Sequence, residues 1–394
     1  MESNIRRISV LSAGVGAGHM RAAQAIAEAL PLLDPSVQVQ VVDVLQHAAP
    51  GFRTLYRDAY VALANRTPRL VGWLYDRADK AWSDRWYASA IERLALHRWL
   101  RSMERDTPDA VVCTHFLPAA LIDGLRRSGR VRVPMTTVVT DLDVHGLWLD
   151  GRADRWCVAG EEAERIICRE GVEPSTVRVT GIPITRAFES LPSREAARAM
   201  LGVPSHRPLV LFSTGGCCLG PVEQTFGLLQ ELRDVATVVA ICGHSEHARK
   251  RLQAMVPNAA RNDMRVIGFT SEMHAWMAAA DLIVGKPGGL TSSEARAAGL
   301  PMVAIHAIPG QEERNLAHLL EWGAAIACLT PSTLPWRIRS LLADSARMHR
   351  MRCAALASAR PSAARMVAET VIETTHAHEA IITTQGVHSP TCAA

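Results

Sequence analysis

Short apolar runs alternate along this chain with longer segments in which apolar residues recur at helical spacing. Such runs, bounded by Gly, Pro and Asp, predict buried strands of parallel sheets, and the segments between them predict helices. In the first half we expect strands near 7–13, 37–44, 109–115, 134–140, 154–159 and 177–181. In the second half we expect them near 208–214, 236–242, 264–268, 281–285, 301–305 and 324–328. The alternation predicts an α/β fold with two doubly wound parallel sheets.

The pattern also suggests where the two domains meet. The segment 181–188, followed by Pro192, is the predicted crossover. We therefore expect an N-terminal domain over residues 1–185 and a C-terminal domain over 186–350. The Ala- and Arg-rich end predicts further helices over 351–382, which could pack back on the N-terminal domain. The polar residues 383–394 are expected to be a frayed tail.

Composition narrows the class of protein. The chain has 394 residues, 48% hydrophobic and 21% charged, which is ordinary for a globular protein of two domains. It contains no apolar run long enough to span a membrane, and its first residues carry no signal-peptide core. Nine scattered cysteines form no C-x-x-C pair, which is typical of reduced cytosolic thiols. A net charge of +4 is too small to indicate nucleic-acid binding.

Aromatic and basic residues are concentrated between positions 50 and 105. This window holds all four tyrosines, four of the nine tryptophans, and eleven Arg or Lys against six Asp or Glu. Trp73 and Tyr75 lie at its centre. Aromatic rings mixed with arginines suit a membrane interface. The alternative is a helical pair that packs on its own domain and leaves its arginines in water.

A glycine-rich motif, KPGGLTSSEARAAGLP, occupies residues 286–301 directly after a predicted strand. Gly288 and Gly289 let the backbone come close to a ligand, and hydroxyl side chains follow where a helix begins. Gly299 and Pro301 mark the end of that helix. A helix N-terminus with a glycine-rich approach favours an anion, most often a phosphate.

Glu294 lies one turn into the helix, where it could accept hydrogen bonds from ribose hydroxyls. A purely structural interpretation is also open, because Thr291 and Glu294 have the spacing of a capping box.

A second glycine-rich loop, GVGAGH, follows the first predicted strand and ends at His19. With Asp43 it could be a dinucleotide fingerprint, but His19 stands where that pattern needs a glycine. A histidine presented by such a turn can act as a general base, since imidazole titrates near pH ~6.5. The alternative is a histidine that caps or packs locally.

Further polar side chains follow other predicted strands: Asp141 and Asp143 in VVTDLDVHGLWL, and His115 after DAVVC. They could line a site between the domains. Each could equally orient a loop.

Several motifs together carry a resemblance that runs from about residue 7 to about residue 345. They are GVGAGHMRAAQAI, VVTDLDVHGLWL, DRWCVAGEEA, VRVTGIPI, KPGGLTSSEARAAGLPMVAI and IPGQEERNLAHLLEWGAAI. In this order they resemble the diacylglycerol glycosyltransferases, which are the monogalactosyldiacylglycerol synthases and the processive diacylglycerol glucosyltransferases of glycosyltransferase family 28. The resemblance implies a GT-B architecture of two Rossmann-like domains with a cleft between them.

The resemblance implies that the C-terminal domain binds a UDP-sugar. It places residues 288–292 at the diphosphate, Glu294 at the ribose, and the backbone of Phe269 and Thr270 at the uracil. It places Gln311, Glu312 and Asn315 at the sugar hydroxyls. The expected donor-site residues are Gly215, Gly216, Phe269, Thr270, Lys286, Gly288, Gly289, Leu290, Thr291, Ser292, Glu294, Gln311, Glu312 and Asn315. Cys217 and Cys218 depart from the family pattern beside Gly216, and we interpret them as small buried fillers rather than a redox pair.

The resemblance further implies that the N-terminal domain binds the lipid acceptor, with His19 as the base. The residues expected on the acceptor side are Gly16, Gly18, Trp73, Tyr75, Asp141, Asp143 and His145. The implied enzyme is an inverting, metal-independent hexosyltransferase without a cofactor, acting on diacylglycerol. Its implied place is the cytoplasmic face of the cell membrane, bound peripherally to anionic lipid.

Other functions stay open at this stage. A transferase acting on a polyprenyl-diphosphate-linked sugar and a soluble UDP-sugar epimerase share the fold. A nicotinamide-dependent oxidoreductase would use the Gly14–Gly18 loop, but His19 at the final glycine position argues against it. The intact set of His19, Thr291 and Glu294 argues against a non-catalytic lipid-binding protein.

Overall fold

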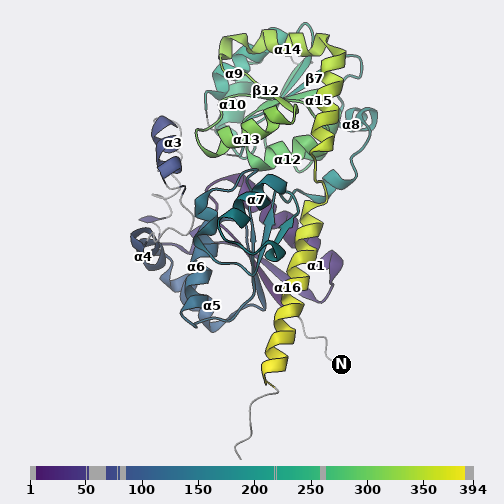
Figure 1. The fold of residues 1–394 in the computed structure, drawn as a ribbon. Helices are drawn as coiled ribbons and strands as arrows, with labels where there is room; N and C mark the ends of the chain where they lie inside the picture. The colour runs from purple at the N-terminus through teal and green to yellow at the C-terminus, as the bar shows by residue number, and fades with distance from the viewer. Residues whose placement is uncertain are drawn as a thin grey trace, which may run out of the picture.

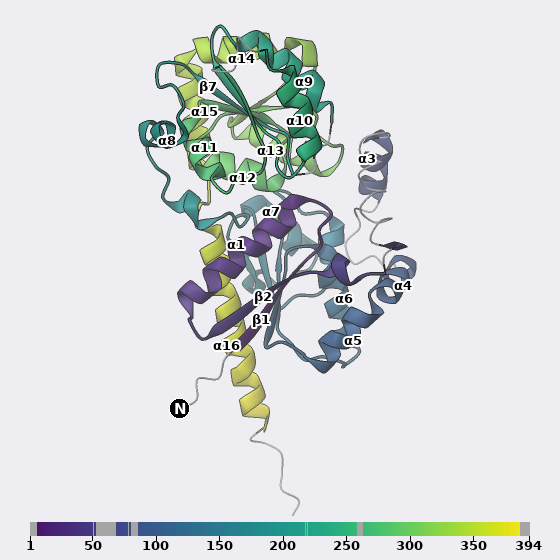
Figure 2. The ribbon, with the colours of Figure 1, turned by 180° about the vertical axis from the view of Figure 1, so that it is seen from behind.

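The computed structural model describes residues 6–49, 51–52, 68–77, 79, 86–216, 218, 220–257 and 263–386. These residues form two α/β domains, each built around one six-stranded parallel sheet (Figures 1 and 2). The expected GT-B fold class is confirmed. All twelve predicted strands form, each within a few residues of its expected position, because buried β-branched runs need both faces covered.

The N-terminal sheet has the strand order β2-β1-β3-β4-β5-β6. Its strands are β1 (Arg6–Ser12), β2 (Val37–Asp43), β3 (Ala110–Cys113), β4 (Met135–Val138), β5 (Arg155–Val158) and β6 (Val177–Val179). Its helices are α1 (Ala17–Leu33), α3 (Pro68–Arg77), α4 (Trp86–Ala95), α5 (His97–Arg105), α6 (Phe116–Arg127) and α7 (Glu161–Arg169). The order reverses at β1, so that the loops after β1 and β3 diverge there and leave room for a ligand.

The C-terminal sheet has the order β12-β11-β10-β7-β8-β9. Its strands are β7 (Leu209–Ser213), β8 (Thr237–Ile241), β9 (Met264–Ile267), β10 (Leu282–Gly285), β11 (Met302–Ala304) and β12 (Ala325–Ala327). Its helices are α8 (Arg194–Leu201), α9 (Val222–Leu229), α10 (Glu246–Met255), α11 (Met273–Ala279), α12 (Gly289–Ala297), α13 (Gln311–Glu321), α14 (Leu334–Ala343) and α15 (Ser345–Ala357).

The last helix, α16 (Ala363–Gly386), returns to the N-terminal domain and runs along it (Figures 1 and 2). Val367, Ala368 and Val371 pack into the same buried cluster as Ile8 of β1. The α16 helix therefore completes the cover of the first sheet, and the chain passes between the domains twice.

Helix α12 begins three residues earlier than a capping box of Thr291 and Glu294 would require. Its N-cap is Gly288, which makes no side-chain cap, and the Ser292 N–H donates to the Gly288 carbonyl at 2.9 Å. Thr291 is thus inside the helix, so the capping-box interpretation of Thr291 and Glu294 is wrong. The predicted end is confirmed, since Gly299 follows the helix with φ of +58°.

The aromatic window is only partly described. Tyr56, Tyr60 and Trp82 lie outside the described residues. Trp73 is 55% exposed on α3, whereas Trp99 is buried in the N-terminal core. Within the described part of the chain, no helix is both long and apolar enough to cross a membrane.

Candidate active site at the domain interface

Three glycines bring the two domains into contact at the ends of their strands. A Cβ on Gly289 would lie only 2.4 Å from the carbonyl oxygen of Thr140. A Cβ on Gly216 would lie 2.2 Å from Cβ of Ala17, and one on Gly18 would lie 3.7 Å from Leu290. Each predicted glycine loop therefore touches the opposite domain, and larger side chains at 216 and 289 would push the domains apart.

His19 lies in the first turn of α1, at this contact. Its Nδ1 is 2.6 Å from Oγ1 of Thr140, which in turn lies 3.4 Å from the carbonyl oxygen of Thr114. If the threonine hydroxyl donates to that carbonyl, it accepts from Nδ1–H, and Nε2 keeps a free lone pair. Burial lowers the pKa of His19, while the charge of Asp141 opposes that shift. The imidazole is then neutral near pH 7 and can accept a proton.

His115 has a different role. It is 3% exposed, and its Nδ1 accepts the Leu117 N–H at 3.1 Å, which caps α6. Its ring lies edge-on to His19, with centroids 4.8 Å apart. Burial holds its pKa well below the usual range. His115 therefore supports the His19 ring as a structural neighbour.

Asp141 joins the domains from inside the interface. It accepts hydrogen bonds from the Trp148 indole N–H at 3.1 Å and from the Gln311 amide. Burial raises its pKa, and His19 and Gln311 oppose that rise. Gln311 was expected at the sugar hydroxyls, and here its amide is engaged by the N-terminal domain.

Asp143 belongs to an ion-pair cluster around Arg314 of α13. The Arg314 guanidinium lies 2.6 Å from Asp79, 3.2 Å from Asp143 and 5.4 Å from the Tyr75 ring centre. The carboxylates raise the pKa of Arg314 against its burial. Neither Arg314 nor Asp79 was predicted from the sequence, although Arg314 lies only two residues after the PGQE motif.

His145 is buried, and both ring nitrogens have partners. Nδ1 accepts the Leu147 N–H at 3.1 Å, so Nε2–H donates to the Tyr75 carbonyl at 2.8 Å. Burial lowers its pKa. The structure thus gives His145 a bracing role between Tyr75 and the short 3-10 helix Gly146–Asp150.

Glu294 lies on the first turns of α12 and faces the N-terminal domain. Its side chain is 1% exposed and accepts from Arg21 at 2.6 Å. Burial raises the pKa of Glu294 to about 7, and Arg21 opposes the rise. Arg21, two residues after His19 on α1, was not predicted from the sequence either.

The remaining donor-site candidates surround the start of α12. Lys286 pairs with Glu312 at 3.2 Å, and the Ile308 N–H donates to the same carboxylate at 2.8 Å. Ser292 is fully buried, and its hydroxyl has no partner among the described residues. Asn315 is also fully buried, and its Oδ1 accepts the Leu142 N–H at 3.0 Å.

The outer rim of the C-terminal sheet carries an exposed aromatic pair. Phe269 is 61% exposed and stacks on His244, with ring centres 4.2 Å apart. Thr270 accepts the Glu272 N–H at 3.0 Å. A pocket at the ends of β7 and β11 is lined by Phe212, Ser213, Thr214, Gly220, Pro221, Val222, Thr225, Lys286, Ile305 and His306.

Cys218 lies in the loop after β7 with a φ of +49°. Its Sγ is 3.0 Å from Thr214 Oγ1 and 3.3 Å from the Cys242 carbonyl. Cys217 lies outside the described residues.

Both domains are similar in sequence to known proteins. Residues 19–184 match the family described as monogalactosyldiacylglycerol (MGDG) synthase, and residues 221–367 match the glycosyltransferase family 28 C-terminal domain. The chain is 27% identical over 335 residues to processive diacylglycerol beta-glucosyltransferases of Staphylococcus aureus strains Newman and COL, covering 84% of this chain and 83% of each relative.

Solved structures share the fold. MurG of Acinetobacter baumannii matches with a TM-score of 0.59 at 20% identity, over 93% of this chain and 99% of that chain. MnaA of S. aureus, solved with UDP, matches with a TM-score of 0.62 at 15% identity, over 92% and 94%. The UDP-GlcNAc 2-epimerase of Neisseria meningitidis matches with a TM-score of 0.58 at 13% identity, over 93% and 100%.

Proposed function

The chain belongs to the diacylglycerol glycosyltransferases of family 28 and is a UDP-sugar-dependent hexosyltransferase, and we propose that it moves a hexose to the hydroxyl of diacylglycerol at a membrane surface. In this proposal the reaction inverts the anomeric centre and uses neither metal nor cofactor. The position of His19 carries the proposal, because this imidazole lies where the N-terminal domain meets the start of α12.

The acceptor hydroxyl attacks the anomeric carbon on the face opposite UDP. The new carbon–oxygen bond forms as the bond to the β-phosphate oxygen breaks, and Nε2 of His19 takes the hydroxyl proton. The bond between His19 and Thr140 supports this role, because it orients the ring and, when Nδ1 is the donor, leaves Nε2 unprotonated. The electron pair of the broken bond leaves on UDP.

The start of α12 would stabilise the leaving UDP. The N–H groups after Gly288 have no acceptor within their own helix, and the helix dipole is positive at this end. Lys286, immediately before this turn, is paired with Glu312 and would add its positive charge to the phosphate site by exchanging that carboxylate for the diphosphate. These groups would stabilise the developing negative charge, which is the contribution that a metal makes in other glycosyltransferases.

Helix α4 supports action at a membrane. Ile91 and Leu94 are 61% and 75% exposed, and their spacing of three residues puts them on one face. Arg98 and Arg101 on α5 add positive charge nearby in the chain. We therefore place the enzyme on the inner, anionic face of the cell membrane, bound peripherally.

Vesicle sedimentation tests this surface. Replacing Ile91 and Leu94 by Ser should weaken binding to vesicles containing anionic lipid by about tenfold or more, since each inserted side chain contributes roughly 1 kcal/mol. Leu32→Ser on α1, which is 59% exposed, is the matched control. Equal binding by the double variant and this control would rule out α4 as the docking surface.

The catalytic proposal is tested with diacylglycerol vesicles and radiolabelled UDP-glucose or UDP-galactose, in the presence of EDTA. Wild-type protein should transfer label to the lipid. His19→Ala should lower the turnover number by about 10²–10⁴ while binding UDP normally by calorimetry. His47→Ala on the surface is the control. Transfer by His19→Ala at the wild-type rate would refute the base assignment, and loss of label with EDTA would refute metal independence.

A further inference from the structure

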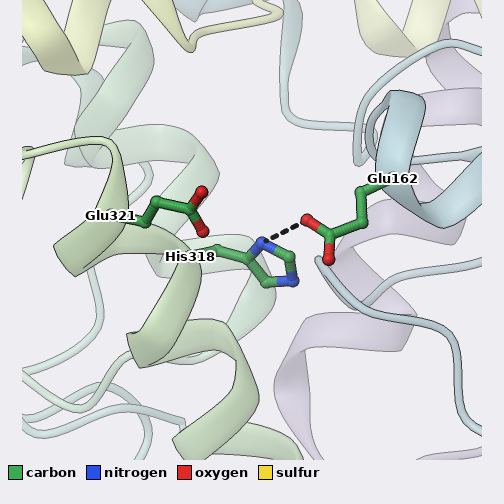
Figure 3. A group of neighbouring side chains, drawn as sticks. All are labelled: Glu162, His318 and Glu321. Atoms are coloured by element: carbon green, nitrogen blue, oxygen red, sulfur yellow. Dashed lines mark ion pairs between the residues drawn. The ribbon is translucent and has the colours of Figure 1, made fainter.

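A histidine and two glutamates converge at the domain interface, away from His19. Glu162 lies on α7 of the N-terminal domain, and His318 and Glu321 lie on α13 of the C-terminal domain (Figure 3). One ligand atom from each of the three lies within 4.8 Å of the other two. Nδ1 of His318 is 3.5 Å from a carboxylate oxygen of Glu162. The group therefore has three metal-ligating side chains that point toward one another.

The charges of this cluster are not balanced by the protein. Among the residues that the structure describes, no lysine or arginine forms an ion pair with Glu162 or Glu321. Two carboxylates in close proximity repel each other, and a bound cation would relieve that repulsion. Glu161, the neighbour of Glu162, shows the contrast, because it pairs with Arg360 at 2.5 Å.

The geometry suits a small dication of the zinc type. A tetrahedral zinc site with bonds of about 2.0–2.1 Å keeps its ligand atoms roughly 3.3 Å apart. The His318 side chain on α13 is 11% exposed, whereas that of Glu162 on α7 is 65% exposed. His318 and Glu321 are three residues apart on one helix face. Imidazole nitrogen together with carboxylate oxygen favours zinc over magnesium, which prefers oxygen ligands alone.

We propose that Glu162, His318 and Glu321 form a divalent transition-metal site, with zinc as its model ion, that clamps α7 to α13 across the domain interface. His318→Gln separates this site from the transfer reaction, because EDTA should leave label transfer by that variant unchanged if catalysis itself uses no metal. Its effect would reach the active site through α13, because Gln311 and Asn315 on this helix bond to the N-terminal domain. A bound cation would therefore favour the closed arrangement of the domains.

Zinc binding is measured at pH 7.5 by competition with a chromophoric chelator. The test protein carries Cys353→Ser, because His349 and Cys353 lie 3.5 Å apart and could bind zinc themselves. In this background His318→Gln and Glu162→Gln should each lose one equivalent of zinc or bind it at least tenfold more weakly. Glu164→Gln, on the same turn of α7, should bind as the background protein does.

Hydrogen exchange provides the second readout. Zinc should slow amide exchange in α7 and α13 of the background protein, and should leave exchange in His318→Gln unchanged. Equal zinc binding by the background protein, His318→Gln and Glu162→Gln would overturn the site. Zinc binding without slower exchange would overturn the clamp, and equal competition by magnesium would overturn the assignment to a transition metal.

Discussion

Replacing Arg21 by Met should destabilise the protein in a pH-dependent manner. Arg21 is the cation beside the buried carboxyl of Glu294, at 2.6 Å. The pKa of Glu294 is raised to about 7 by burial, and Arg21 limits the rise. Methionine keeps most of the side-chain volume and removes the charge, so the variant leaves Glu294 buried without its partner.

The direction in which stability changes with pH follows from the protonation of Glu294 in the folded and unfolded states. Between the ordinary pKa of a glutamate and pH 7, folded wild-type protein holds a proton on Glu294 that the unfolded chain releases. Its stability therefore falls as pH rises through that window and levels off above about 7. Without Arg21 the pKa rises further, so stability should go on falling above pH 7. Relative to wild type, the variant should lose little stability at pH 6 and more at pH 8.

The loss of stability caused by Arg21→Met can be bounded from the burial of Arg21 and Glu294. Removing one partner of a fully buried ion pair costs about 3–5 kcal/mol. Arg21 is 38% exposed, so solvent already screens its charge and the cost should fall to about 1–2 kcal/mol at pH 8. At pH 6 Glu294 is mostly protonated, and only a neutral hydrogen bond of roughly 0.5 kcal/mol is lost.

Urea unfolding followed by tryptophan fluorescence measures the loss of stability at pH 6 and at pH 8. Arg21→Lys is the control that keeps the charge, and it should lose less than the Met variant at pH 8. Combining Arg21→Met with Glu294→Gln should restore most of the loss, since no charge then remains buried. Equal destabilisation at both pH values would refute the ionic explanation.

Two further predictions concern the contact between the domains. Thr140→Val removes the hydroxyl that orients His19, and should lower turnover about tenfold and shift the pH–rate profile, whereas Thr140→Ser should restore both. Gly289→Ala places a Cβ 2.4 Å from the Thr140 carbonyl and should weaken UDP binding measured by calorimetry, whereas Gly160→Ala, whose Cβ meets nothing within 4 Å, should not. Unchanged UDP affinity in Gly289→Ala would show that the closed contact is not used in binding.

The sequence predicted the sheets well because their signal is local. A buried parallel strand needs a continuous apolar run, and every such run formed a strand. The end of α12 was equally local, since Gly299 adopts a positive φ that other residues avoid. The start of α12 was predicted less well: Thr291 has the capping-box spacing, but the glycines before it let the helix begin earlier.

Contacts between the domains could not be predicted from the local sequence pattern. Arg21 and Glu294 are 273 residues apart, and Asp143 and Arg314 are 171 apart. Nothing in the pattern around either arginine distinguishes it from a solvated surface charge. His115 and His145 show the converse, because their spacing after strands was compatible with a site, and only the partners of their ring nitrogens show that they act as caps.

The partners of the donor-site candidates bear on how UDP-sugar binding would proceed. In this closed arrangement Glu294 bonds to Arg21, Gln311 to Asp141 and Asn315 to the Leu142 N–H, each across the domain interface. A donor sugar nucleotide placed as proposed would have to replace these bonds with its own hydroxyls. For Gln311 and Asn315 each exchange trades one hydrogen bond for another, so the net free energy per contact is small. At Glu294 the exchange also separates a buried carboxyl from Arg21, so the ribose hydroxyls must offset the loss of an ion pair. Occupancy of the donor site would then shift the balance between the open and closed arrangements of the domains.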